Sequence, residues 1–263
     1  MGVYAITGAT SGIGASCAKM LKEQGHKVIS ISRGEGADIR ADLSIKAERD
    51  RAIKELQAIA ADGLDGFIAN SGVGPSQPGE RIVSLNYFAA KEMTEAAFPL
   101  VQKKDGVILV VSSNSANLPA LNTELVDIMC NANDEEAARA YAGKLVDGDK
   151  QQAYQGSKFA IGRWVRRNSS YYITHGVRMN AIAPGATWTK LMEEGLADPV
   201  FSDSMKTYPV PALYGKPGLN GMQDPDDIAK VMLFLLSPES KAICGAFIYA
   251  DGGTDGFMRT ERC

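Results

Sequence analysis

Short apolar segments alternate along this chain with longer segments of helical length, and this alternation limits the folds that it can adopt. The apolar segments have the composition of strands that are buried on both faces. Alternating strands and helices predict an α/β fold, in which helices cover both faces of a doubly wound parallel sheet of about seven strands. The expected strands are Val3–Thr7, Lys27–Ser32, Asp38–Ala41, Gly66–Asn70, Val107–Ser112, Val177–Ala183 and Phe247–Ala250. The expected helices are Gly12–Gln24, Lys46–Ala60, Ile82–Gln102, Tyr154–Ile173 and Pro225–Leu236.

Two longer segments interrupt the alternation. Residues 114–151 are predicted to be a helical insert, and residues 190–224, rich in proline, glycine and apolar side chains, a substrate lid. Both follow the C-terminal ends of expected strands, where open α/β sheets bind ligands. The chain has 263 residues, no internal repeat and no linker long enough to divide it, so we predict a single domain over residues 1–263.

Charge and cysteine usage argue against several classes of protein. A formal net charge of −3 gives no electrostatic reason to expect nucleic acid or an anionic membrane as a partner. The four cysteines are scattered and only two histidines are present, so no metal is expected. No apolar run approaches the length of a membrane span, and the N-terminus lacks the basic region of a signal peptide. These features predict a cytoplasmic protein.

The first expected strand runs into a glycine-rich turn, Thr7-Gly8-Ala9-Thr10-Ser11-Gly12-Ile13-Gly14, which leads directly into the first expected helix. Glycines allow a tight turn and let backbone N–H groups approach a pyrophosphate at a helix N-terminus. A plain tight turn is the alternative interpretation. The position between a first strand and a first helix favours dinucleotide binding, as in Rossmann-type sheets.

A tyrosine and a lysine, Tyr154 and Lys158, are four residues apart in an expected helix and therefore share one face of it. An ammonium about 4 Å from a phenolate stabilises it by roughly 4 kcal/mol at an effective dielectric near 20. We therefore expect Lys158 to lower the pKa of Tyr154 and make it a usable acid or base. An exposed helix with a solvated lysine is the alternative interpretation for the pair taken alone.

Six motifs in order connect these features. They are the turn at residues 7–14, Asn70-Ser71-Gly72, Ser113, the pair Tyr154 and Lys158, Pro184-Gly185 and Asp251-Gly252-Gly253. Together they resemble the motif set of the short-chain dehydrogenase/reductase family over essentially the whole chain. The run at 185–189, the insert before Tyr154 and the closing run at 251–259 most resemble its bacterial 3α-hydroxysteroid dehydrogenase/carbonyl reductase branch.

The resemblance implies a catalytic set of four residues, Ser113, Tyr154, Lys158 and Asn86. Tyr154 would exchange a proton with the substrate oxygen, and Lys158 would also bond the nicotinamide ribose. Ser113 would hold the substrate oxygen, although its neighbour Ser112 is an alternative, since the two point to opposite faces of a strand. Asn86 would complete a proton relay with Lys158. Its alternative role is a helix-interior amide bonded to backbone.

The resemblance also implies a nicotinamide cofactor, and NADP(H) is favoured. Family members that use NAD carry an acidic residue at the end of the second strand, where this chain has Ser32 followed by Arg33. An arginine there can pair with a 2′-phosphate. NAD(H) stays open, because Arg33 can be a solvated side chain and because Glu35 and Asp38 lie close by. The expected cofactor-binding residues are Gly8, Thr10, Ser11, Gly12, Ile13, Gly14, Ser32, Arg33, Asp42, Leu43, Asn70, Ser71, Gly72, Tyr154, Lys158, Pro184, Gly185, Thr187 and Thr189.

The reaction that the resemblance implies is the interconversion of a secondary alcohol and a ketone. Apolar residues in the expected lid favour a small apolar substrate, a hydroxysteroid or bile acid, although they can equally pack the lid onto the core. A carbonyl reductase for other bulky or aromatic ketones is the alternative. A non-catalytic NADP-binding regulatory module is a more remote one. We expect a homodimer or a homotetramer.

Overall fold

Seven parallel strands form the centre of the molecule. The computed structural model describes residues 1–146, 149–208 and 221–261, and these form one sheet with strand order β3-β2-β1-β4-β5-β6-β7. The predicted α/β, Rossmann-type fold is confirmed, and each strand boundary lies within two residues of its predicted position. The strands are β1 Val3–Thr7, β2 Lys27–Ser32, β3 Ile39–Arg40, β4 Gly66–Ala69, β5 Val107–Val111, β6 Arg178–Pro184 and β7 Phe247–Ala250.

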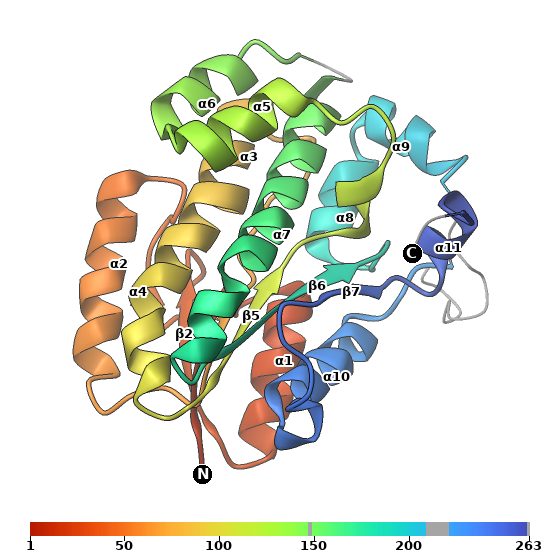
Figure 1. The fold of residues 1–263 in the computed structure, drawn as a ribbon. Coiled ribbons are helices and arrows are strands. Elements are labelled where there is room, and N and C mark those ends of the chain that lie inside the picture. Colours follow the sequence, from red (N-terminus) through yellow and green to blue (C-terminus); the bar gives the residue numbers. More distant parts are fainter. Residues whose placement is uncertain (147–148, 209–220, 262–263) are drawn as a thin grey trace.

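Helices cover both faces of this sheet (Figure 1). On one face, α1 (Gly12–Glu23) packs against α10 (Pro225–Leu236). On the other face lie α2 (Lys46–Ile59), α4 (Ala90–Gln102) and α7 (Lys150–Thr174). Apolar side chains form a separate buried cluster under each helical layer. Every residue of β5 is buried, which explains why this central strand is a continuous run of Val, Ile and Leu.

One predicted helix has an interruption that the sequence did not indicate. The segment predicted as Ile82–Gln102 begins as α3 (Gly79–Val83), passes through the π-helical turn η1 (Ser84–Ala89) and continues as α4. All residues of η1 are buried. A π-helical turn shifts the backbone hydrogen-bond pattern by one residue, and such turns often occur at functional sites. Here the turn contains Asn86, one of the four expected catalytic residues.

The two irregular segments contain short helices at the end of the molecule where α7 begins (Figure 1). The first holds η2 (Asn114–Asn117), α5 (Thr123–Asp127), η3 (Ile128–Ala132) and α6 (Glu135–Ala142). The second holds α8 (Lys190–Leu196) and α9 (Pro199–Met205), and its residues 209–220 lie outside the described residues. The remaining elements are η6 (Pro238–Ser240) and α11 (Thr254–Met258). None of the helices in the described ranges is long and apolar enough for a bilayer crossing.

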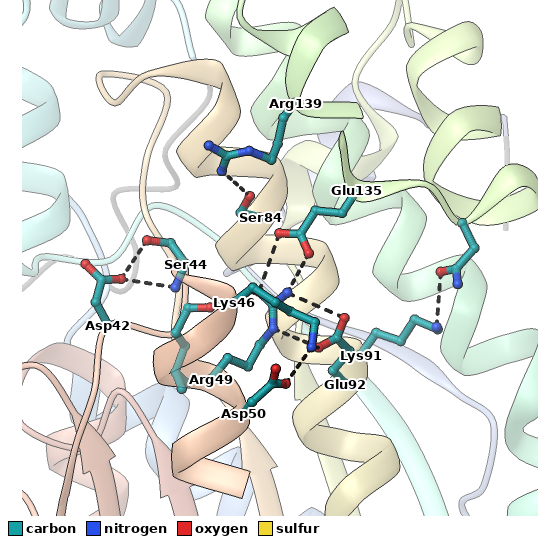
Figure 2. Close-up of polar contacts among 12 residues, drawn as sticks. Asp42, Ser44, Lys46, Arg49, Asp50, Ser84, Lys91, Glu92, Glu135 and Arg139 are labelled. Carbon is teal, nitrogen blue, oxygen red and sulfur yellow. Dashed lines mark hydrogen bonds and ion pairs between the residues drawn. The ribbon is translucent and has the colours of Figure 1, made fainter. Parts of the chain in front are cut away.

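A buried arginine fastens the insert to the rest of the fold (Figure 2). Arg49 of α2 is fully buried and donates to Glu92 of α4 at 2.8 Å and to Glu135 of α6 at 2.5 Å. It also donates to the Leu43 carbonyl at 3.0 Å. In the same view Arg139 of α6 donates to Ser84 at 2.8 Å. Polar contacts therefore connect α6 with α2, η1 and α4.

Candidate active site

A cavity of about 380 Å³ opens at the carboxyl ends of the central strands. Its floor comes from the ends of β1, β4, β5 and β6, and its roof includes α8, α9 and Tyr208. This is the position at which ligands bind in open α/β sheets, and the volume lies within the usual range for ligand pockets, roughly 300–1,000 Å³.

The glycine-rich turn forms one side of this cavity. Gly8 has a φ of +72°, a left-handed conformation that favours glycine. A Cβ at Gly14 would lie 2.3 Å from the Gly8 carbonyl oxygen, so no side chain fits there. Asn70 closes the turn from β4, because its amide donates to the carbonyls of Thr7 and Gly8, each at 3.2 Å. The turn leaves the N-terminus of α1 open to an anionic group such as a pyrophosphate.

The end of β2 forms a second part of the cavity wall. Ser32 and Thr10 share a hydrogen bond between their hydroxyls at 2.7 Å. The Arg33 side chain is 58% exposed, and its Nη1 lies 3.9 Å from Oδ2 of Asp42. Burial alone would raise the pKa of Asp42, but hydrogen bonds from Ser44 and the charges of Arg81 and Arg33 together lower it. Asp42 is thus an ionised neighbour of Arg33, held in place by Arg81 at 2.7 Å.

The structure separates the two serines at the end of β5. Ser112 donates its hydroxyl to the backbone carbonyl of Lys158 at 2.7 Å and so holds α7 against the strand. Ser113 follows the strand, and its hydroxyl accepts a hydrogen bond from the Ser115 backbone at 3.2 Å. The pKa of Tyr154 is raised by burial, and a hydrogen bond with Ser113 opposes this rise. Ser113 is therefore the serine that meets Tyr154.

Lys158, the lysine of the pair, is buried beside the end of β5. Lys158 is 5% exposed, and its Nζ donates to the Val111 carbonyl at 3.1 Å. Burial lowers its pKa to about 8. Burial of the phenol raises the pKa of Tyr154 in this structure, and the expected lowering by Lys158 stays a prediction.

Asn86 lies behind this group of residues. Its side chain is bonded to the backbone of Val73, accepting at 2.9 Å and donating at 3.0 Å, as the alternative interpretation held. It still lies close to the lysine. A Cβ at Gly72 would meet Asn86 Oδ1 at 3.2 Å and Lys158 Nζ at 3.3 Å. Glycine at position 72 therefore leaves room for both side chains, which would have to shift slightly for a larger residue.

Two family models match this chain. The model described as short chain dehydrogenase covers residues 2–124, and the model described as enoyl-(acyl carrier protein) reductase covers residues 136–255. The 3-alpha-hydroxysteroid dehydrogenase/carbonyl reductase of Comamonas testosteroni is 34% identical over 98% of both chains. This chain belongs to the short-chain dehydrogenase/reductase family.

A solved structure and a further relative agree with the family assignment. The 3-alpha-hydroxysteroid dehydrogenase of Pseudomonas sp. B-0831, complexed with NADH, superimposes with a TM-score of 0.92 at 33% identity. That comparison covers 99% of this chain and 100% of the other. A coniferyl-alcohol dehydrogenase of Pseudomonas sp. is 28% identical over 94% of each chain. The protein is therefore an oxidoreductase that uses a nicotinamide cofactor.

Most residues that the sequence indicated for this short-chain dehydrogenase/reductase site line the cavity, and three do not. Thr10 is hydrogen-bonded to Ser32, which lines the cavity. Gly14 packs against the Gly8 carbonyl, and Asn86 lies beside Gly72. The catalytic and binding roles themselves stay predictions. The expected residues that line the cavity are Gly8, Ser11, Gly12, Ile13, Ser32, Arg33, Asp42, Leu43, Asn70, Ser71, Gly72, Ser113, Tyr154, Lys158, Pro184, Gly185, Thr187 and Thr189.

The sequence-based site omitted four residues of the insert that line the cavity, Asn114, Ser115, Leu118 and Gln151. A signal for them was present. Asn114, Ser115 and Leu118 lie in or just after η2, the first element after β5, and Gln151 lies one helical turn before Tyr154. Residues at the carboxyl end of a central strand face the ligand site of this fold.

Proposed function

We propose that this enzyme interconverts a secondary alcohol and a ketone on a bulky apolar substrate, with a hydroxysteroid or bile acid as the preferred class. One observation carries the proposal: the cavity joins a polar floor to an apolar roof. Ser113 and Tyr154 lie on the floor. Similarity to two hydroxysteroid dehydrogenases supports the substrate class. The roof contributes Leu191, Met192, Phe201 and Met205.

The chain's residues divide the work of such a reaction. A bound nicotinamide dinucleotide supplies or accepts the hydride. The Tyr154 phenol gives a proton to the substrate oxygen during reduction and takes one during oxidation. Ser113, which meets Tyr154, holds that oxygen by a hydrogen bond and stabilises the charge that develops on it. Lys158, four residues along the same helix, stabilises the phenolate when Tyr154 has given up its proton.

The cavity fits a dinucleotide of this kind. The glycine turn leaves backbone N–H groups free of side chains where a pyrophosphate would lie, since Gly8 and Gly14 admit no larger residue without strain or collision. We assign NADP(H) as the preferred form. The exposed Arg33 supports this choice, and the end of β2 has Ser32 in place of an acid. Two observations favour NAD(H) instead. Asp42 Oδ2 lies 3.9 Å from Arg33 Nη1 and can pair with it in place of a 2′-phosphate, and the similar Pseudomonas protein was solved with NADH.

Replacing Arg33 by alanine tests the cofactor assignment. We expect Arg33→Ala to raise KM for NADPH roughly 10-fold or more, because a charge-assisted pair to a 2′-phosphate is lost, and to leave KM for NADH within about 2-fold. Lys27→Ala, at the exposed opposite end of the same strand, is the control and should change neither value. Equal changes for both cofactors, or none, would reject the 2′-phosphate role of Arg33.

A substrate panel tests the function itself. The purified enzyme is assayed with NADP⁺ and NAD⁺ on 3-, 7-, 12- and 17-hydroxysteroids, and with NADPH and NADH on the ketosteroids and on simple aromatic ketones. Turnover of at least one steroid with a higher kcat/KM than any aromatic ketone supports the proposal. A preference for the aromatic ketones would establish the carbonyl reductase alternative. No turnover of any alcohol or ketone would reject both.

Further expectations from the sequence stay predictions. They are the division into a 114–151 insert and a 190–224 lid, the cytoplasmic location, and the homodimer or homotetramer. Light scattering after size-exclusion chromatography measures the oligomeric state directly.

A further inference from the structure

A second phenol, that of Tyr208, lines the same cavity as Tyr154. It follows α9, so it belongs to the roof rather than to the floor. Its hydroxyl oxygen is shielded from solvent and makes no hydrogen bond within the described residues. Buried hydroxyls nearly always have a partner. Because Tyr208 lines the ligand cavity, a ligand can supply the partner that its hydroxyl lacks.

The neighbours of Tyr208 among the described residues do not supply that partner. The side chains of Asn114 and Ser115 lie close to the phenol, but neither makes a hydrogen bond of normal geometry with it. The Asn114 amide nitrogen donates to Asp251 Oδ2 at 3.3 Å. Burial raises the pKa of Tyr208 to about 12, and Tyr154 and Asp251 contribute to the rise. Tyr208 thus keeps its proton near neutral pH and can donate a hydrogen bond.

Both phenols line the same cavity, Tyr154 from the floor and Tyr208 from the roof, so a substrate that is held by Tyr154 also lies beside Tyr208. Asp251 is 5% exposed and acts on the same phenol, which disfavours a second anion there. The partner should therefore be a neutral oxygen.

We propose that Tyr208 is a specificity-determining residue that donates a hydrogen bond to a second, neutral oxygen of the substrate, near the reacting carbonyl. The inference rests on the proposed ketone–alcohol chemistry and adds to it. The enzyme then favours ketones that carry a neighbouring hydroxyl or keto group over the same ketones without it. Tyr154 exchanges the proton, whereas Tyr208 selects which carbonyl compound is held.

A matched pair of ketones tests this inference. The probes are 2-hydroxy-1-indanone and 1-indanone, which differ by one hydroxyl. For the unmodified enzyme with NADPH we expect kcat/KM to favour the hydroxyketone by roughly 3- to 10-fold, the range of a single hydrogen bond. Tyr208→Phe should remove this preference and leave kcat/KM for 1-indanone within about 2-fold. Tyr171→Phe, an exposed tyrosine on α7, should keep the preference.

Two outcomes overturn the inference: the preference survives in Tyr208→Phe, or the variant loses activity equally on both ketones. Calorimetric dissociation constants of the two ketones, measured with NADPH bound, decide the role of Tyr208 even if neither ketone is turned over. A lack of turnover by the unmodified enzyme counts against the proposed function instead. Thermal unfolding adds a third readout. Tyr208→Phe should leave Tm unchanged or raise it, because no hydrogen bond is lost, and a clear fall in Tm would assign the hydroxyl a structural partner.

Discussion

Two regions of this molecule each bury a cation, but only one of them pairs that cation with carboxylates. Under the insert, Arg49 is fully buried and contacts two carboxylates, Glu92 and Glu135. On the cavity floor, Lys158 is almost as buried, yet its Nζ donates to the carbonyl of Val111, and no carboxylate pairs with it in the described ranges. The first charge is compensated and holds three helices together. The second charge, that of Lys158, has no carboxylate among the described residues to offset the free-energy cost of its burial. It is therefore available to stabilise a phenolate that forms during the reaction.

The comparison predicts opposite signs for removing the two cations. Arg49→Met leaves two carboxylates without their shared partner and should lower the free energy of unfolding by about 3–5 kcal/mol. Chemical denaturation near neutral pH measures this loss. Arg51→Met is the matched control, since that side chain is 48% exposed, pairs with Glu55 on its own helix and also donates to the Arg40 carbonyl, and it should change stability by only about 1 kcal/mol. An equal, small effect of both variants would show that the buried pair is not structural.

Removing Lys158 should stabilise the protein and abolish its activity. Burial lowers the pKa of Lys158 from 10.5 to about 8, which corresponds to roughly 3 kcal/mol, since one pKa unit is about 1.4 kcal/mol. Between those values the unfolded chain binds more protons than the folded one, so this contribution to stability rises with pH. Below about pH 8 the buried ammonium costs its full amount.

Unfolding curves at several pH values measure that effect. Near pH 7, Lys158→Met should be more stable than the unmodified protein by up to roughly 3 kcal/mol. The difference should shrink as the pH rises from about 8 towards 10.5. A variant that is less stable at every pH would mean that the contact with Val111 outweighs the burial of the charge.

Removing one carboxylate of the insert should have the smallest effect. Glu135→Gln leaves Arg49 paired with Glu92, so we expect a loss of about 1–2 kcal/mol in the free energy of unfolding. Glu136→Gln alters the neighbouring, exposed glutamate of the same helix and should be nearly neutral. A loss as large as that of Arg49→Met would show that Glu135 carries the whole interaction.

The sequence predicted the fold well because buried parallel strands are continuous apolar runs, and β5 is such a run. It also predicted most residues of the cavity, since these lie in the turn after β1 and at strand ends. It did not predict the pairing of Arg49 with Glu135, because those residues are 86 positions apart and Glu135 belongs to a run that resembles any solvated helix. The π-helical turn around Asn86 was missed for a similar reason, since its hydrogen-bond shift leaves no mark on apolar spacing.

The chemistry of the cavity floor depends most directly on Tyr154. The decisive measurement compares kcat/KM of the unmodified enzyme, Tyr154→Phe and Tyr171→Phe on the best substrate of the panel, together with the dissociation constant of NADPH for each. Tyr154→Phe should lower kcat/KM by roughly 10²–10⁴-fold, the contribution of a positioned general acid or base, with the NADPH dissociation constant within about 2-fold. Tyr171→Phe, an exposed site on the same helix, should match the unmodified enzyme in both. Near-normal turnover by Tyr154→Phe would contradict the assignment of this tyrosine as the proton-transfer residue.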